Sequence, residues 1–170
     1  MESLCVMKAW KIVLVSLACT TSIVVLFYLA GASQMARLSG TITKVRTLGV
    51  EPKAAVAIVD FRATNNSEVL FMSGERRVTV IGRHGIKYDG RISSAFDLSQ
   101  LFKYFPALGA MTHEPYIKGI KLKPGQSIVG MLAARFEMSK TDLDMRREII
   151  LDLYDSDGSL TELKMATQPQ

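Results

Sequence analysis

Cysteine is nearly absent from this chain, which has 170 residues and two cysteines. Both of them, Cys5 and Cys19, lie before residue 34, so the remainder of the chain contains none. A structural disulfide and a cysteine-ligated metal centre are therefore excluded for that remainder. A domain without thiols is compatible with an oxidising compartment, although it does not require one.

Residue combinations typical of catalysis are missing as well. The chain has no Gly-x-Ser-x-Gly motif around a nucleophilic serine, and no Lys-Ser/Thr pair of a phosphate-binding loop follows the glycine-rich stretch 82–90. There are two histidines, His84 and His113, and neither has an acidic partner that is evident from the sequence. We therefore expect a protein that is not an enzyme and that needs no cofactor.

Charged side chains are absent between Lys11 and Arg37. As a helix, the 21 residues from 12 to 32 would be about 31 Å long, which matches the hydrocarbon layer of a bilayer. The apolar part of a cleaved signal peptide is shorter, about 7 to 15 residues. After a short tail (1–11), the sequence thus predicts a transmembrane helix over 12–33 that acts as a signal anchor, with these anchoring residues: Trp10, Ile12, Val24, Phe27 and Tyr28.

Cleavage after Ala32 remains an alternative, because Ala30-Gly31-Ala32 has the small-x-small form that signal peptidases recognise. The flanking lysines and arginines do not decide the orientation, since both ends of the apolar stretch carry basic residues. Long domains translocate largely regardless of such charges. We expect a single-pass protein of a cell inner membrane, with the C-terminal domain on the periplasmic or extracytoplasmic side.

Short β-rich segments and turn signals fill the rest of the chain, which we divide into a stalk with the first strand (34–53), a β-sandwich (54–165) and a tail (166–170). Segment 54–63 alternates, with Phe61 on one face and Asp60 on the other, which predicts a half-buried strand. Three hairpins are predicted, with turns at residues 83–85, Pro124-Gly125 and Asp157-Gly158. A second turn signal, Asp89-Gly90, follows the first of these turns.

One segment has helical instead of strand periodicity. Four apolar residues recur at positions i, i+3, i+4 and i+7, which predicts a short helix over 97–105 with Asp97 as its N-cap and Pro106 as its stop. Phe96 and Tyr104 lie off this apolar stripe, so part of the helix is expected to face a partner or the bilayer surface. The predicted partner contacts are Phe96, Leu98, Leu101, Phe102, Tyr104 and Phe105.

The segments "VTVIGRHG", "LKPGQSIVGMLAARFEM" and "LDLYDSDGSL" together resemble small bacterial immunoglobulin-like domains, which often follow a single membrane span. "LYDSDG" resembles the signature of the Phe-x-Leu-Tyr-Asp group, with Leu151 in place of the phenylalanine, and "KPGQS" is similar to a turn of water-stress sandwiches. The resemblance covers about residues 54–163. It implies a mainly β fold, an immunoglobulin-like antiparallel β-sandwich, and it transfers no catalytic residue. The helix predicted over 97–105 is not part of the family pattern, so we expect this sandwich to carry one short helical insert.

Charge and soft side chains bear on the class of ligand. The net charge is +5, but basic residues alternate with acidic ones instead of forming a stripe, so nucleic acid is not an expected partner. Met111 and His113 offer a thioether and an imidazole that suit copper(I), yet two ligands do not complete a metal site.

We therefore expect a non-enzymatic, membrane-anchored β-sandwich module that contacts the bilayer through residues 12–33 and a membrane protein through its domain. It would serve as an accessory or assembly subunit of a membrane complex. The alternative is a small-ligand or copper carrier on the outer face of the membrane.

Overall fold

A computed structural model describes residues 2–31 and 35–165 and divides the chain into two units, residues 1–35 and 36–170. The first unit contains helix α1 (Glu2–Gly31), which has apolar side chains on all sides and lacks a distinct polar face. Trp10 and Val24 are exposed on α1. Within the stretch of chain that the structure describes, no helix is long and apolar enough to cross a membrane. The transmembrane helix over 12–33 thus remains a prediction from the sequence.

Several predictions about the termini concern residues outside the described part. The cleavage position after Ala32 and the tail 166–170 lie outside it, as do the side chains of Ile12, Phe27 and Tyr28.

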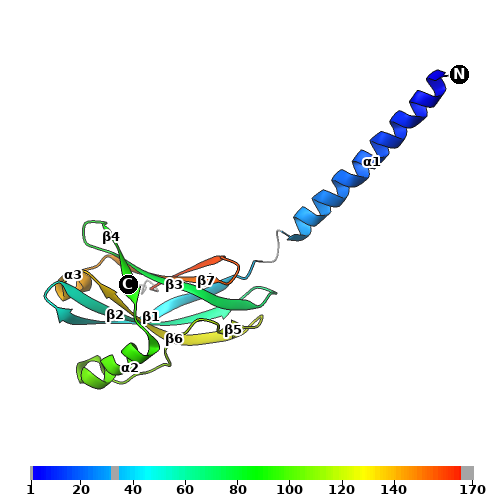
Figure 1. Ribbon diagram of the computed structural model, residues 1–170. Helices are drawn as coiled ribbons and strands as arrows, with labels where there is room; N and C mark the ends of the chain where they lie inside the picture. The colour runs from blue at the N-terminus through cyan, green and yellow to red at the C-terminus, as the bar shows by residue number, and fades with distance from the viewer. Residues whose placement is uncertain (1, 32–34, 166–170) are drawn as a thin grey trace, which may run out of the picture. The chain divides into compact units, whose positions relative to one another are not determined.

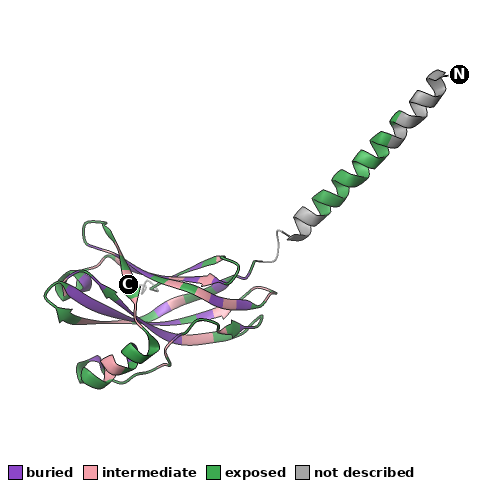
Figure 2. Ribbon diagram, in the orientation of Figure 1, coloured by how far each residue is buried: buried purple, intermediate pink, exposed green. Residues whose placement is uncertain are grey.

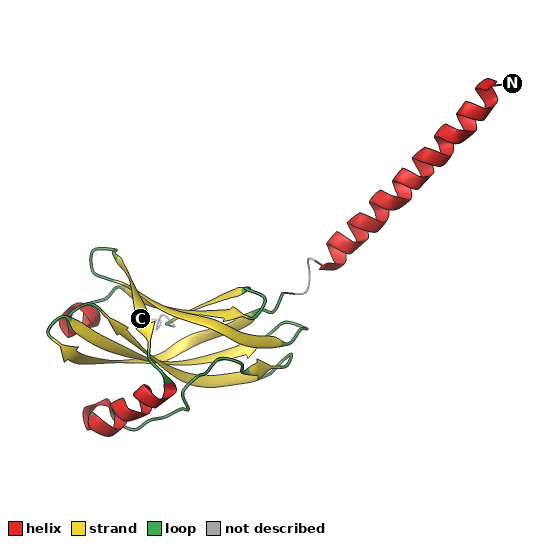
Figure 3. Ribbon diagram, viewed as in Figure 1, coloured by secondary structure: helices red, strands yellow, loops and turns green. Residues whose placement is uncertain are grey.

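The second unit is built on eight strands in one curled sheet (Figures 1 and 3). The strands follow the order β1-β2-β6-β4-β3-β7-β8, every neighbouring pair is antiparallel, and the short β5 pairs with β3. The prediction of a mainly β, antiparallel domain is confirmed. The strands are β1 (Leu38–Glu51), β2 (Ala54–Asn65), β3 (Phe71–Ile81), β4 (Lys87–Ile92), β5 (Lys121–Leu122), β6 (Ser127–Phe136), β7 (Glu148–Asp155) and β8 (Leu160–Lys164).

Strand β4 joins the two halves of the sheet. Its beginning pairs with β3, from Lys87 to Gly90, and its end pairs with β6 through Arg91 and Ile92. At the opposite side β1 meets β8, where Ile42 forms a parallel bridge with Met165. The halves β1-β2-β6 and β3-β7-β8 therefore face each other around one core, in which the largest fully buried side chains include Phe61, Phe71, Phe136, Ile149, Leu151 and Leu153.

The predicted hairpins are confirmed in two of three cases. The strands β3 and β4 pair across the turn at residues 82–86, and β7 pairs with β8 across Asp157-Gly158. The hairpin around Pro124-Gly125 is wrong, because β5 pairs with β3 and not with β6, although Gly125 has the positive φ of a turn. Asp89-Gly90 is not a turn either. It lies within β4, where a Cβ atom on Gly90 would approach the Phe136 ring to 2.6 Å.

The predicted helix is present as α2 (Ala95–Tyr104), with its N-terminus three residues earlier than the predicted cap implies. Ser94 is the N-cap, and its hydroxyl accepts a hydrogen bond from the backbone N–H of Asp97. Asp97 returns the interaction to the backbone N–H of Ser94, which makes a capping box. A short 3-10 turn, η1 (Pro106–Leu108), and a helix α3 (Lys140–Asp144) are additional to the single helix that was predicted.

Candidate interaction surface beside helix α2

Residues 93–116, which we call the insert, connect β4 to the segment before β5 and cover the outer face of β2 and β6. Figure 1 shows α2 on the side of β2 and β6 that faces away from β3 and β7. The insert begins where Ser93 donates to the Ala133 carbonyl, and it ends where Tyr116 donates to the Met131 carbonyl. A second core cluster forms beneath it from Val56, Ile58, Leu98, Leu108, Met131 and Ala133.

This cover makes the prediction of a half-buried strand over 54–63 wrong. Seven side chains in this segment are fully buried. They include Ile58 and Asp60, which lie on the face opposite Phe61. The physical reason is that the insert removes water from the face that alternation assigned to solvent.

Asp60 and Arg46 form a buried ion pair under the insert. The guanidinium Nη2 of Arg46 lies 2.7 Å from the carboxylate Oδ2 of Asp60, and the two side chains are 9% and 1% exposed. Removing one partner of such a pair leaves an uncompensated buried charge, which is strongly destabilising. The stability of the domain therefore depends on keeping both Arg46 and Asp60.

Arg46 also holds the insert directly. Its Nη1 donates to the carbonyl oxygens of Leu108 at 3.2 Å and Ala110 at 3.0 Å, and its guanidinium lies 4.8 Å from the centre of the Phe102 ring. One side chain from β1 thus binds a carboxylate on β2 and two carbonyls of the insert. The insert is fastened to the sheet by charge-assisted hydrogen bonds as well as by apolar contact.

His113 completes the contacts of Asp60. Its Nδ1 lies 3.3 Å from Asp60 Oδ1, and the hydroxyl of Thr112 donates to the same oxygen at 3.4 Å. Met111, the other candidate copper ligand, is 38% exposed. Among the described residues, no cluster of three or more histidine, cysteine or acidic side chains is arranged to hold a metal. The contacts that the structure gives His113 are those of a residue that holds the insert in place.

Sequence reasoning missed Arg46 and Asp60. The available signal was a single aspartate inside the otherwise apolar run "AAVAIVDF", because a charge in a strand that is buried on both faces requires a partner.

The six predicted contact residues divide into two groups. Leu98 is 2% exposed, and Leu101 and Phe102 pack partly buried against the second core cluster. Phe96, Tyr104 and Phe105 are exposed by 70%, 68% and 37%. Figure 2 shows exposed and half-buried residues along α2. The helix therefore uses one side to attach itself to the sheet and presents Phe96 and Tyr104 to solvent, while Phe105 is its C-cap residue.

A groove of about 420 Å³ runs between α2 and the strands beside it. Val50 near the end of β1, Val56 of β2 and Leu101 of α2 contribute apolar walls, and Arg91 and Arg135 contribute charge. The hollows near α3 combine opposite charges, as in the one lined by Asp144, Arg146, Arg147 and Glu148. The groove beside α2 thus combines apolar walls with the exposed aromatic side chains of Tyr104 and Phe105.

The groove lies at the end of the sandwich that is far from residue 36. Strand β1 begins at Leu38 and reaches Val50 only near its other end, so about 40 Å of strand separates the two at 3.3 Å per residue. The chain enters the domain at one end, and the groove opens near the other.

Comparisons with known proteins leave the function open. No family model matches the chain, and no curated protein matches it. A functionally unknown protein from Listeria monocytogenes is similar in structure, with a TM-score of 0.36, 14% identity, and coverage of 78% of this chain and 73% of that one. An uncharacterized β-sandwich protein from Clostridium difficile has a TM-score of 0.33, 12% identity, and coverage of 78% and 82%. The description of the fold rests on the strand pairing itself.

Proposed function

We propose that this protein is a non-enzymatic module tied to a membrane by α1, and that it contacts a partner protein through the exposed side of α2. It serves as an accessory or assembly subunit of a membrane complex. The observation that carries the proposal is the exposure of Phe96 and Tyr104 on a helix that is attached to the sheet through buried Leu98 and the contact of Arg46 with the Phe102 ring.

The order of the strands supports an immunoglobulin-like sandwich. If the strands are lettered A to G in chain order and the two-residue β5 is omitted, then β1, β2, β4 and β6 are A, B, D and E, and β3, β7 and β8 are C, F and G. The groups ABED and CFG are those of constant-type immunoglobulin domains. Strand β4 differs from a plain D strand because it pairs with both groups.

Membrane attachment rests on the sequence of the first unit. The 21 uncharged residues from 12 to 32 are long enough for the hydrocarbon layer, and apolar side chains occur on all sides of α1. The proposed location is the outer face of a cell inner membrane.

The fixed position of α2 supports binding over a merely structural role for its outer side. Large aromatic side chains that stay exposed contribute little to the free energy of folding. At interfaces, such side chains contribute much of the binding free energy. A surface held in one conformation before binding also loses less conformational entropy when a partner docks. Leu98 is buried against the sheet and the Arg46 guanidinium lies over the Phe102 ring, so α2 is held on that side and its outer residues are available for contact.

Co-purification of tagged full-length protein from native membranes tests this proposal. We expect a partner protein to accompany the unaltered chain, and we expect the double variant Phe96→Ser/Tyr104→Ser to lose at least nine-tenths of it (about 1.4 kcal/mol). Leu160→Ser is the matched control, because Leu160 is 53% exposed on β8 and lies outside the insert. Capture of no protein by the unaltered chain, or equal capture by both variants, would contradict the proposal.

A further inference from the structure

We propose that the groove beside α2 binds an extended apolar segment of the partner protein that carries a carboxylate, and that Arg91 and Arg135 hold this carboxylate. This inference rests on the proposed function, and it specifies the chemistry that the same surface recognises.

Arg91 and Arg135 are directly opposite each other, in register between β4 and β6. Like charges at such positions repel and destabilise the pairing of the strands. Arg135 has a partner in Glu51 at 3.0 Å, and both of these side chains are about half exposed. Arg91 is exposed, and within the described residues it forms no ion pair. The two strands thus place an uncompensated positive charge at the wall of the groove.

The acidic side chain in the groove is already engaged. Asp97 lines it, but its carboxylate accepts hydrogen bonds from the hydroxyl and the backbone N–H of Ser94 as part of the capping box. Within the described residues, Asp97 forms no ion pair with Arg91 or Arg135. The groove therefore offers a ligand the guanidinium of Arg91, next to that of Arg135, which Glu51 already contacts on one side.

The rest of the lining selects the kind of anion. Val50, Val56, Ile92, Leu101 and Phe105 form apolar walls, which favour aliphatic or aromatic side chains over a phosphate backbone. A guanidinium binds a carboxylate through two parallel hydrogen bonds, so one acidic residue among apolar ones fits both features. A volume of about 420 Å³ lies within the range of sites that enclose small ligands or a few side chains.

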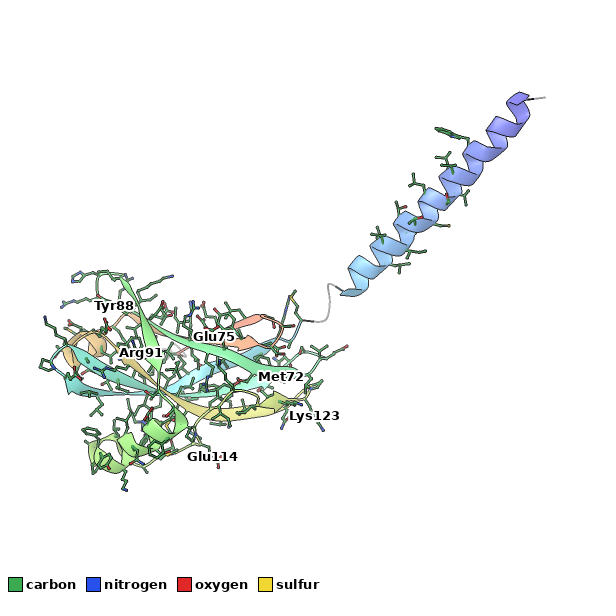
Figure 4. The ribbon with its side chains drawn as sticks, in the orientation of Figure 1. Met72, Glu75, Tyr88, Arg91, Glu114 and Lys123 are labelled. Atoms are coloured by element: carbon green, nitrogen blue, oxygen red, sulfur yellow. The ribbon has the colours of Figure 1, made fainter. Side chains whose placement is uncertain are left out.

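A second hollow is lined by the same two arginines. It measures about 490 Å³ and is lined by Lys87, Tyr88, Asp89 and Glu137 in addition to Arg91 and Arg135. Figure 4 labels Tyr88 and Arg91, which both belong to β4. An extended segment can therefore cross the arginine pair with its carboxylate there and its apolar residues toward α2.

Selection of random seven-residue peptides displayed on phage against the full-length protein in detergent micelles tests this chemistry. We expect the enriched peptides to carry an aspartate or glutamate beside leucine, isoleucine or an aromatic residue. Replacing that acid by its amide in a synthetic copy should weaken binding at least tenfold. Failure to enrich any peptide, or enrichment of peptides without an acid, would overturn the proposal.

Arg91→Glu separates binding from folding. The substitution removes the repulsion from Arg135 and adds an opposite charge, so we expect a thermal midpoint equal to or above that of the unaltered chain, and at least a tenfold loss of peptide binding. Arg62→Glu is the control, because Arg62 is exposed on β2 and does not line the groove. If both variants bind the peptide like the unaltered chain, the arginine pair does not hold the carboxylate.

The same variants in the membrane co-purification distinguish this inference from the proposed function. Loss of the partner with Phe96→Ser/Tyr104→Ser but full retention with Arg91→Glu would overturn the carboxylate inference and leave the proposed function standing. Absence of any partner with the unaltered chain would overturn the proposed function.

Discussion

The two halves of the sheet differ in what covers their outer faces. The half β3-β7-β8 leaves its outer face to solvent, where Arg77, Asp152 and Glu162 stand side by side across three strands. The half β1-β2-β6 carries the insert, and Asp60 and Arg46 are buried beneath it. In the half β1-β2-β6, the insert therefore turns the outer face of the sheet into a second core. The charges of Asp60 and Arg46 in this core stabilise the fold instead of facing solvent.

The largest effect is expected from Arg46→Met. It leaves Asp60 buried without its cation and removes two hydrogen bonds to the insert, so the free energy of unfolding should fall by about 3 to 5 kcal/mol. Urea unfolding of the full-length protein in detergent, followed by circular dichroism, measures it.

Two companion variants sharpen this result. Arg62→Met changes an exposed arginine on the strand and face that also carry Asp60, and it should stay within about 0.5 kcal/mol. The double variant Arg46→Met/Asp60→Leu replaces the pair by apolar groups and should regain a large part of the loss. Equal effects of Arg46→Met and Arg62→Met would show that the buried pair is not special to the covered half.

The second effect concerns the apolar attachment of the insert. Leu98→Ala removes a fully buried side chain and should lower the free energy of unfolding by about 3 kcal/mol. Leu160→Ala, on the edge of the open half, should change it by less than about 0.5 kcal/mol. The same denaturation measurement compares them, and a small effect of Leu98→Ala would mean that α2 is attached only through its polar contacts.

A smaller effect should follow from Ser94→Ala. The capping box at the start of α2 is lost, which should lower the free energy of unfolding by about 1 kcal/mol. Ser99→Ala, inside the same helix, should be neutral or slightly stabilising, because the Ser99 hydroxyl only bonds back to the Ala95 carbonyl. If Ser99→Ala lowered the free energy of unfolding as much as Ser94→Ala does, the effect of Ser94→Ala would not come from the capping box.

The smallest effect is a pH dependence on the open half. Burial and the facing Glu162 raise the pKa of Asp152 above its ordinary value, and its Oδ1 is buried without a hydrogen-bond partner. Between the ordinary pKa and the raised pKa, the folded protein binds more protons than the unfolded chain. The free energy of unfolding therefore falls as pH rises through this interval. Asp152→Asn should flatten this slope in unfolding curves recorded at a series of pH values.

Asp157 gives the opposite sign as a control. The backbone N–H of Ser159 donates to its carboxylate and lowers the pKa of Asp157, so its contribution to stability is present above its ordinary pKa and is lost as pH falls through the lowered value. Asp157→Asn should remove that loss at acidic pH. If Asp152→Asn and Asp157→Asn changed the slope of stability against pH in the same direction, the opposite pKa shifts given to the two carboxyl groups would be wrong.

The success of sequence reasoning follows the same division between the two halves. On the open half, strands such as β7 have one apolar and one polar face and short turns, so alternation and Asp157-Gly158 sufficed to predict the β7–β8 hairpin. On the covered half, burial of both faces of β2 depends on contacts with residues about 50 positions away, such as Thr112 and His113 at Asp60. The lone aspartate in the apolar run indicates that a partner is needed, but no local pattern identifies residues so far along the chain.

The candidate site was predicted to a similar extent. The predicted partner contacts included Leu98, Leu101 and Phe102, which instead pack against the sheet. Phe96 and Tyr104, which lie off the apolar stripe in the sequence, are exposed. The arginine pair of the groove was not predicted, because Arg91 and Arg135 meet only through the pairing of β4 with β6. That pairing arises where β4 passes from one half of the sheet to the other.

Site-specific photocrosslinking in native membranes tests the central claim most directly. A p-benzoylphenylalanine side chain is introduced at Tyr104 on the insert or at Leu160 on the open half, both of which are exposed. The account predicts a discrete covalent adduct with one partner protein from position 104 and none from position 160. An adduct from position 160 alone, or no adduct from either, would contradict it.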